Sequence, residues 1–225
     1  MYRGSSKNCQ KTFEDLKDGR ERIEKICREL LKNEIIVALG CTEPGTIAYA
    51  AACAKEILGA IPNHMEIYVS GNILKNVKSV VIPNTQNLKG IAEAAFCGIV
   101  GGNPKRKLEV LNTLTMADVE MVRKLVAEEN MYDVHLSRVQ EPLYVRVELI
   151  RGEHTSLVEI QKNHLNITKV QKDGKDITRQ YQYRECVGEV NGSEYKLKLK
   201  DIYNFAYETE IGDLENLMKL QITHN

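Results

Sequence analysis

The spacing of apolar residues changes once along this chain, and that change limits the folds it can adopt. Before residue 130, apolar residues recur at intervals of three and four, which places them on one face of a helix. After residue 130, apolar and polar residues alternate, as in strands with one buried face, until helical spacing returns at residue 199. We therefore predict an α+β fold, in which a helical N-terminal half packs with an antiparallel β meander and C-terminal helices follow.

This pattern also predicts the organisation of the chain. We expect a flexible arm over 1–12, a mainly helical region over 13–130, an antiparallel β region over 131–198 and helices over 199–225. The expected helices cover 13–33, 46–58, 91–100, 105–111 and 116–129, the last with Thr115 as its N-cap. The expected strands cover 65–70, 78–82, 132–136, 143–151, 156–161, 167–172, 184–190 and 195–199.

Charge and cysteine usage exclude several classes of protein. Lysine plus arginine equals aspartate plus glutamate, at 31 each, so charge gives no reason to expect nucleic acid or an anionic membrane as a partner. No apolar run is long enough to span a membrane. The six cysteines contain no Cys-x-x-Cys pair, which favours reduced thiols in a cytoplasmic protein over a disulfide framework or a self-contained metal site.

The segment Leu39–Gly45 contains the most informative cysteine, Cys41, between two helical patterns. At a helix start, unpaired backbone N–H groups and the helix dipole favour an anion, so we expect Cys41 to be biased toward thiolate. The alternative is a tight turn whose cysteine is a small buried hydrophobe. Glu43 is either a base or a helix-start carboxylate that complements the dipole, and we favour the second interpretation.

Polar turns after two expected strands supply candidate substrate-binding residues. Asn72, Lys75 and Asn76 follow the first strand, and their amides and ammonium group suit an amino-acid carboxylate. Asn84 and Thr85 follow the second strand and can reach the same pocket. The alternative is an asparagine-rich turn with a solvated lysine, followed by an Asx-type turn.

Glycines and histidines give weaker signals. The glycines at 98, 101 and 102, with Asn103, are candidates for close approach of backbone to a ligand, although they match neither a Walker loop nor a dinucleotide fingerprint. No histidine pair has His-x-x-x-His spacing. We therefore expect structural roles for the histidines, which lie at 64, 135, 154, 164 and 224.

Taken in order, these turns resemble the N-terminal half of a known family. They are Gly40-Cys41-Thr42-Glu43-Pro44, Ser70-Gly71-Asn72, Ile82-Pro83-Asn84-Thr85 and Gly101-Gly102-Asn103. The family is that of the L-cysteine desulfidases, related to the α chain of iron–sulfur L-serine dehydratases. Two later segments also resemble it, His164–Ile167, with Leu165 in place of a threonine, and Leu199–Ala206.

The resemblance implies a β-eliminating lyase of amino-acid catabolism. Such an enzyme converts L-cysteine or L-serine to pyruvate, ammonia and sulfide or water, and a [4Fe–4S] cluster acts as Lewis acid. Cys41 matches the first cluster ligand, supported by Thr42, Glu43 and Pro44, and the asparagines, Lys75 and Thr85 would bind substrate. The other cluster ligands have no match, so we expect a truncated chain that binds no cluster alone and is inactive without a complementary C-terminal half.

Two alternatives remain at this point. One is a non-catalytic binding or assembly module derived from that fold, with alanine-rich helices that pair with a second copy. The other is a thiol enzyme with Cys41 as nucleophile, which requires a nearby base.

Overall fold

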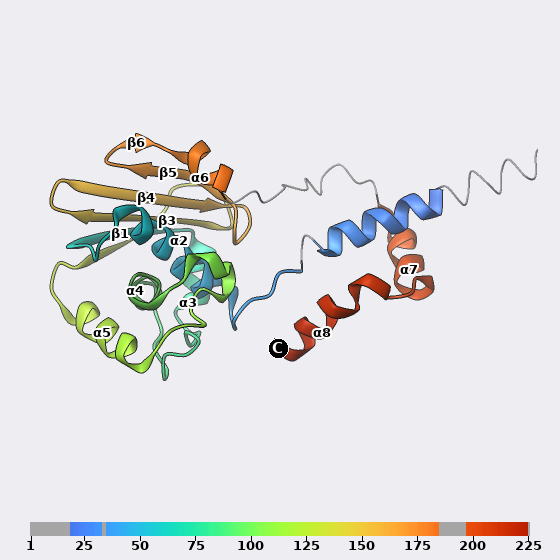
Figure 1. Cartoon of the computed structure of the whole chain (residues 1–225), viewed down its shortest axis with the longest axis horizontal. Helices are drawn as coiled ribbons and strands as arrows, with labels where there is room; N and C mark the ends of the chain where they lie inside the picture. Colours follow the sequence, from blue (N-terminus) through green and yellow to red (C-terminus); the bar gives the residue numbers. More distant parts are fainter. Residues whose placement is uncertain (1–18, 33–34, 185–196, 225) are drawn as a thin grey trace, which may run out of the picture. The chain divides into compact units, whose positions relative to one another are not determined.

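The computed structural model describes residues 19–32, 35–184 and 197–224. These residues form two compact units, one over Val37–Val187 and one that combines described residues of Met1–Ile36 and Gly188–Thr223 (Figure 1). The expected arm over 1–12 and the strands expected at 184–190 and 195–199 fall largely outside the described residues. No helix in the described ranges has both the length and the apolar character that a bilayer crossing requires.

The larger unit contains a mixed sheet of six strands in the order β2-β1-β3-β4-β5-β6. The strands are β1 (His64–Val69), β2 (Tyr132–Leu136), β3 (Tyr144–Arg151), β4 (His154–Gln161), β5 (Ile167–Lys172) and β6 (Lys175–Asp176). The α+β prediction is confirmed. Strands β3 to β6 form the expected antiparallel meander, but β2 pairs in parallel with β1 at the edge of the sheet. The meander prediction was wrong for β2 because β1, from the helical half, lies between β2 and β3.

Helices cover one face of this sheet, as Figure 1 shows. Helix α2 (Thr42–Leu58) packs on β3 and β4, α4 (Ile91–Gly101) packs on α2, and α5 (Met116–Ala127) packs on α4. The unit also contains α3 (Gly71–Val77) and the 3₁₀ helix η1 (Pro104–Glu109), which contact α2, and α6 (Thr178–Arg184), which contacts β5. Helix α5 has the predicted N-cap, since Thr115 and Asp118 form a capping box. The alternation in β1 buries Met65, Ile67 and Val69 beneath the helices and leaves the intervening residues on the other face.

Small residues let α2 and α4 approach closely in the core. The alanines of α2 are almost fully buried, and a Cβ at Gly98 of α4 would lie 2.1 Å from the backbone oxygen of Ala48. The expectation that Gly98 lets backbone approach a ligand was therefore wrong, because the missing side chain of Gly98 lets the backbone of α2 approach α4. The alanine-rich faces are likewise part of the core and are not available to a second copy.

Two short segments differ from the sequence-based expectation. Residues 71–77, expected as a turn, form α3, because the Ser70 hydroxyl caps it by accepting from the backbone N–H of Ile73. Residues 78–82, expected as a strand, are irregular. The Ile82 N–H donates to Leu88 O within the same loop, so it is not available to a sheet.

The smaller unit is helical. It contains a helix over residues 19–32, then α7 (Leu199–Glu208), η3 (Gly212–Leu214) and α8 (Glu215–His224). Arg28 connects the helix over residues 19–32 to the C-terminal part of this unit. Its guanidinium donates to Asp213 Oδ1 at 2.6 Å and to the carbonyl oxygen of Glu210 at 2.7 Å. Cys27 and Leu214 are buried in this unit.

Candidate functional site

Cys41 occupies the N-cap of α2, as the sequence predicts for the start of a helix. Its backbone is extended, with φ −69° and ψ 133°, and its side chain makes no capping hydrogen bond. Gly40, at φ +68°, precedes it, and a Cβ there would lie 2.8 Å from Pro83 Cγ. Cys41 is partly exposed, whereas the other cysteines that the structure describes, at 27, 53 and 97, are buried. It is therefore the described thiol best placed for chemistry.

The Cys41 thiol is held in its protonated form. Sγ donates to Glu43 Oε2 at 2.8 Å. Burial raises the pKa of Cys41, the hydrogen bond to Glu43 raises it further, and backbone N–H groups lower it to a lesser extent. The expected bias toward thiolate was wrong, because burial and a carboxylate outweigh the helix-start N–H groups.

Glu43 is the acceptor at the centre of this site. Besides Cys41, its Oε1 accepts from Asn76 Nδ2 at 2.9 Å, and Thr42 Oγ1 lies 3.3 Å from Oε2. Burial alone would raise the pKa of Glu43, but hydrogen bonds from Cys41 and Asn76 lower it. The carboxylate is therefore ionised at neutral pH. The carboxylate accepts hydrogen bonds from the start of α2 and from α3. Glu43 therefore connects two helices, in addition to complementing the helix dipole as we expected from the sequence.

His164, in the β4–β5 loop, joins the site through Thr46. The Thr46 hydroxyl donates to Thr42 O at 2.9 Å and lies 2.8 Å from His164 Nδ1. Because a hydroxyl has one hydrogen, we assign the hydrogen between Thr46 and His164 to Nδ1, and the lone pair of the neutral ring to Nε2. Burial lowers the pKa of His164, and the nearby charge of Glu43 opposes that shift. The site thus includes a neutral imidazole at neutral pH.

The remaining predicted binding residues lie in different settings. Asn72 and Lys75 are exposed on α3. Asn76, on the same helix, is the residue that donates to Glu43. Asn84 Nδ2 donates to Leu111 O at 3.1 Å. The buried Thr85 hydroxyl donates to the carbonyl oxygen of Ile82 at 2.6 Å and accepts from Leu88 N–H, so it stabilises its own loop. The structure thus joins Asn76 to the Cys41 motif, while the polar groups of Asn84 and Thr85 bind backbone elsewhere.

Sequence reasoning missed the role of His164. The residue lies 118 positions from Thr46, and only the fold brings the two together. The available signal was the segment His164–Ile167, which the sequence singled out without assigning chemistry to its histidine.

The donor set can be tested against a [4Fe–4S] cluster, which needs three thiolates from the chain. Among the described residues, Cys41 belongs to no group of three close ligand atoms, and the thiols of Cys53 and Cys97 lie in the hydrophobic core. Burial raises the pKa of Cys97 to about 12, which disfavours the thiolate. The described part of the chain therefore does not fit such a cluster and offers one suitable thiol.

A hollow of about 590 Å³ lies away from this site, beside β5 and α6. Its lining includes Thr168, Asp176 and Arg179 and none of the Cys41 site residues. The Cys41 site is therefore a polar cluster at a helix start, separate from this hollow.

Comparisons with known proteins find relatives that share one name. The chain is 39% identical over 198 residues to a UPF0597 protein of Lachnoclostridium phytofermentans, a match that covers 88% of this chain and 46% of the relative. It is 36% identical over 208 residues to UPF0597 protein FN1147 of Fusobacterium nucleatum, covering 91% of this chain and 47% of the relative. A UPF0597 protein of Finegoldia magna is 41% identical to the chain over 198 residues, a match that covers 88% of this chain and 47% of the relative. No family model and no solved structure matches the chain.

These relatives correct the sequence-based resemblance. Their names place them in a distinct family, UPF0597, so the identification with the L-cysteine desulfidases and serine dehydratase α chains was wrong. Short turn motifs in a matching order were a weaker guide than identity along most of the chain. The chain spans about half the length of these relatives.

Proposed function

We propose that this chain supplies part of the active site of a β-eliminating lyase that acts on L-cysteine or L-serine. The observation that carries the proposal is the meeting of a thiol, an ionised carboxylate, an amide and a neutral imidazole around the start of α2. These four groups come from Cys41, Glu43, Asn76 and His164.

A β-elimination needs a base for the α-proton and an acid for the departing group. The C–H electron pair becomes the Cα=Cβ bond, the bond from Cβ to sulfur or oxygen breaks, and water then converts the enamine, through its imine, to pyruvate and ammonia. His164 suits the role of base, since its neutral ring has a lone pair at Nε2 while Thr46 holds Nδ1. A base with this geometry needs no prior deprotonation at neutral pH.

Cys41 suits the role of acid for the departing group, and Glu43 suits substrate binding. The thiol is protonated at rest, so it can transfer its proton to a departing sulfide or hydroxide. Glu43 and Asn76 offer a carboxylate and an amide, which match the ammonium and carboxylate groups of an amino acid. Cys41 as a cluster ligand stays a separate prediction that excludes this acid role, because a cluster ligand is a thiolate without a proton to transfer. Any such cluster would need further thiolates from outside the described residues.

The setting that we propose is the cytoplasm, where thiols stay reduced. The four cysteines that the structure describes are all free, which supports this proposal. We propose a small amino acid and a complementary C-terminal segment as the partners of the chain.

The test is pyruvate release by a completed protein. The chain is combined under anaerobic conditions with the segment that completes the Lachnoclostridium phytofermentans relative, loaded with iron and sulfide, and supplied with L-cysteine or L-serine. We expect pyruvate only when both parts are present, and we expect its release to fall in His164→Gln but not in the matched variant His154→Gln. A folded complex that releases no pyruvate from either amino acid contradicts the proposal.

A second candidate, a non-catalytic assembly module, is favoured by one observation on α7. Tyr203 and Tyr207 are 64% and 80% exposed, and their rings stack with centroids 5.8 Å apart. Exposed aromatic residues of this kind are enriched at protein interfaces. Light scattering tests this role: association that disappears in a double Tyr203→Ser, Tyr207→Ser variant, with no lyase activity in the complex above, would favour the module.

A further inference from the structure

The exposed face of the sheet carries a second polar cluster, separate from the Cys41 site. Parallel pairing places Glu66 of β1 beside Asp133 of β2, and Tyr68 beside His135. His64 lies two residues before Glu66 on the same face of β1, because alternate residues of a strand share a face. The cluster thus combines two histidines and two carboxylates from two adjacent strands.

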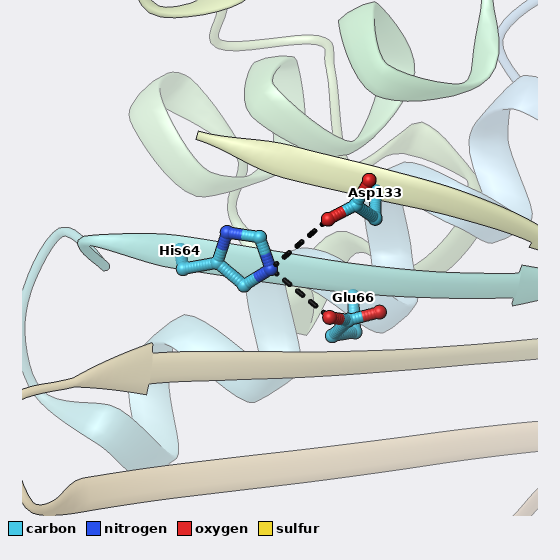
Figure 2. A group of neighbouring side chains, drawn as sticks. All are labelled: His64, Glu66 and Asp133. Atoms are coloured by element: carbon cyan, nitrogen blue, oxygen red, sulfur yellow. Dashed lines mark hydrogen bonds and ion pairs between the residues drawn. The ribbon is translucent and has the colours of Figure 1, made fainter. Parts of the chain in front are cut away.

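The ligand atoms of this cluster converge on a small volume. His64 Nε2 lies 3.0 Å from Glu66 Oε1 and 3.5 Å from Asp133 Oδ2, as Figure 2 shows. His135 Nε2 lies 2.5 Å from the other carboxylate oxygen of Glu66. Two donors that bind one tetrahedral zinc ion at about 2.0–2.1 Å are about 3.3–3.4 Å apart. The two distances from His64 are close to that value, and the ligand atoms of His64, Glu66 and Asp133 all lie within 4.8 Å of one another, so a small adjustment would let these three atoms share one ion.

A backbone carbonyl oxygen fixes the orientation of the His64 ring. Its Nδ1 lies 2.7 Å from the carbonyl oxygen of Asn130. A carbonyl only accepts, so Nδ1 carries the hydrogen and Nε2 is the atom that faces the two carboxylates. Metal-bound histidines almost always have this arrangement, in which the second ring nitrogen donates to a carbonyl or carboxylate and fixes the tautomer.

We propose that His64, Glu66 and Asp133 bind one divalent zinc-type cation, while His135 contacts the second carboxylate oxygen of Glu66 and orients it. Imidazole and carboxylate ligands favour Zn²⁺ over Ca²⁺ or Mg²⁺, which prefer oxygen ligands alone. The ion would link β1 to β2, which is the edge strand of the sheet as far as the described residues show. The proposal is independent of the proposed lyase function, because it uses none of the residues at the start of α2.

The experiment is a titration of the chelator-treated chain with ZnCl₂, followed by calorimetry. We expect one ion per chain at this site, and affinity reduced more than about tenfold in His64→Ala and in Asp133→Asn. The matched control is His154→Ala, because His154 and Asp173 form a His–carboxylate pair, 3.4 Å apart, that belongs to no triad among the described residues. This control is expected to bind as the wild type does. Circular dichroism establishes that each variant is folded, and Glu66→Gln replaces any variant that is not.

X-ray absorption of the zinc-loaded chain identifies the ligands directly. We expect a shell of nitrogen and oxygen with imidazole scattering and no sulfur. Zinc affinity that is equal in the wild type and the His64→Ala variant would overturn the proposal and leave a proton as the occupant between His64 and the carboxylates. A sulfur shell would also overturn it, because the ion would then lie on cysteines.

Discussion

Replacing Glu43 with glutamine should make the Cys41 thiol more reactive. In the wild-type protein, burial raises the pKa of Cys41. The hydrogen bond from Cys41 Sγ to Glu43 Oε2, which is 2.8 Å long, raises this pKa further. Glutamine is neutral, so a thiolate at Cys41 would no longer lie beside a carboxylate charge. The thiolate fraction at neutral pH should therefore increase.

The size of the effect follows from the strength of one charge-assisted hydrogen bond. Such a bond contributes about 1.5–3 kcal/mol, and we take about 1 kcal/mol because solvent screens charges on partly exposed side chains such as Cys41 and Glu43. This energy corresponds to about fivefold more thiolate at neutral pH. Intrinsic nucleophilicity falls together with the thiol pKa, with a Brønsted coefficient of about 0.4–0.5, so the alkylation rate should rise about 2.5-fold.

The assay is peptide-resolved mass spectrometry after brief treatment with iodoacetamide at pH 7. Cys97, whose pKa burial raises to about 12, is the unreactive internal reference. Asn72→Ala is the matched control, because Asn72 is exposed on α3 and the bond from this helix to Glu43 comes from Asn76. An alkylation rate at Cys41 that is unchanged or slower in Glu43→Gln, with the control equal to wild type, would refute the reasoning.

Three further predictions concern stability, measured by chemical or thermal denaturation. Gly98→Ala should destabilise the fold by about 1–3 kcal/mol, because its Cβ would meet Ala48 O; Gly71→Ala, with nothing within 4 Å of its Cβ, should be neutral or slightly stabilising. Thr115→Ala removes a helix cap and should cost about 1 kcal/mol. The lowered pKa of His164 means that the unfolded chain binds more protons below about pH 6.5. Stability should therefore fall with acidification there, and less so in His164→Gln; equal losses in both proteins would contradict this.

Features encoded by neighbouring residues could be predicted from the sequence. Alternation predicted strands β1 to β5, and the residues at 115 and 118 predicted the cap of α5, because both depend on local spacing. The parallel pairing of β2 could not be predicted, since a strand does not encode its partner. The capping of α3 by Ser70 was missed because asparagine and glycine in that segment also favour a turn.

The candidate site was predictable to the same extent. The position of Cys41 at a helix start follows from the local sequence, whereas its protonation depends on how the side chain of Glu43 turns back to it. The approach of His164 to Thr46 and the convergence of His64 with Asp133 depend on strand order and register. These are tertiary properties, and a single sequence carries no local signal for them.

We propose that the residues at the start of α2 perform chemistry on an amino acid. We would measure the rate of pyruvate release from L-cysteine and L-serine by the completed protein, and compare wild type, Cys41→Ser and the exposed control His154→Gln. We expect Cys41→Ser to reduce the rate at least about 100-fold, a loss typical of essential acid–base groups, and we expect the control to keep the wild-type rate. Equal rates in wild type and Cys41→Ser would contradict a role of Cys41 in this chemistry.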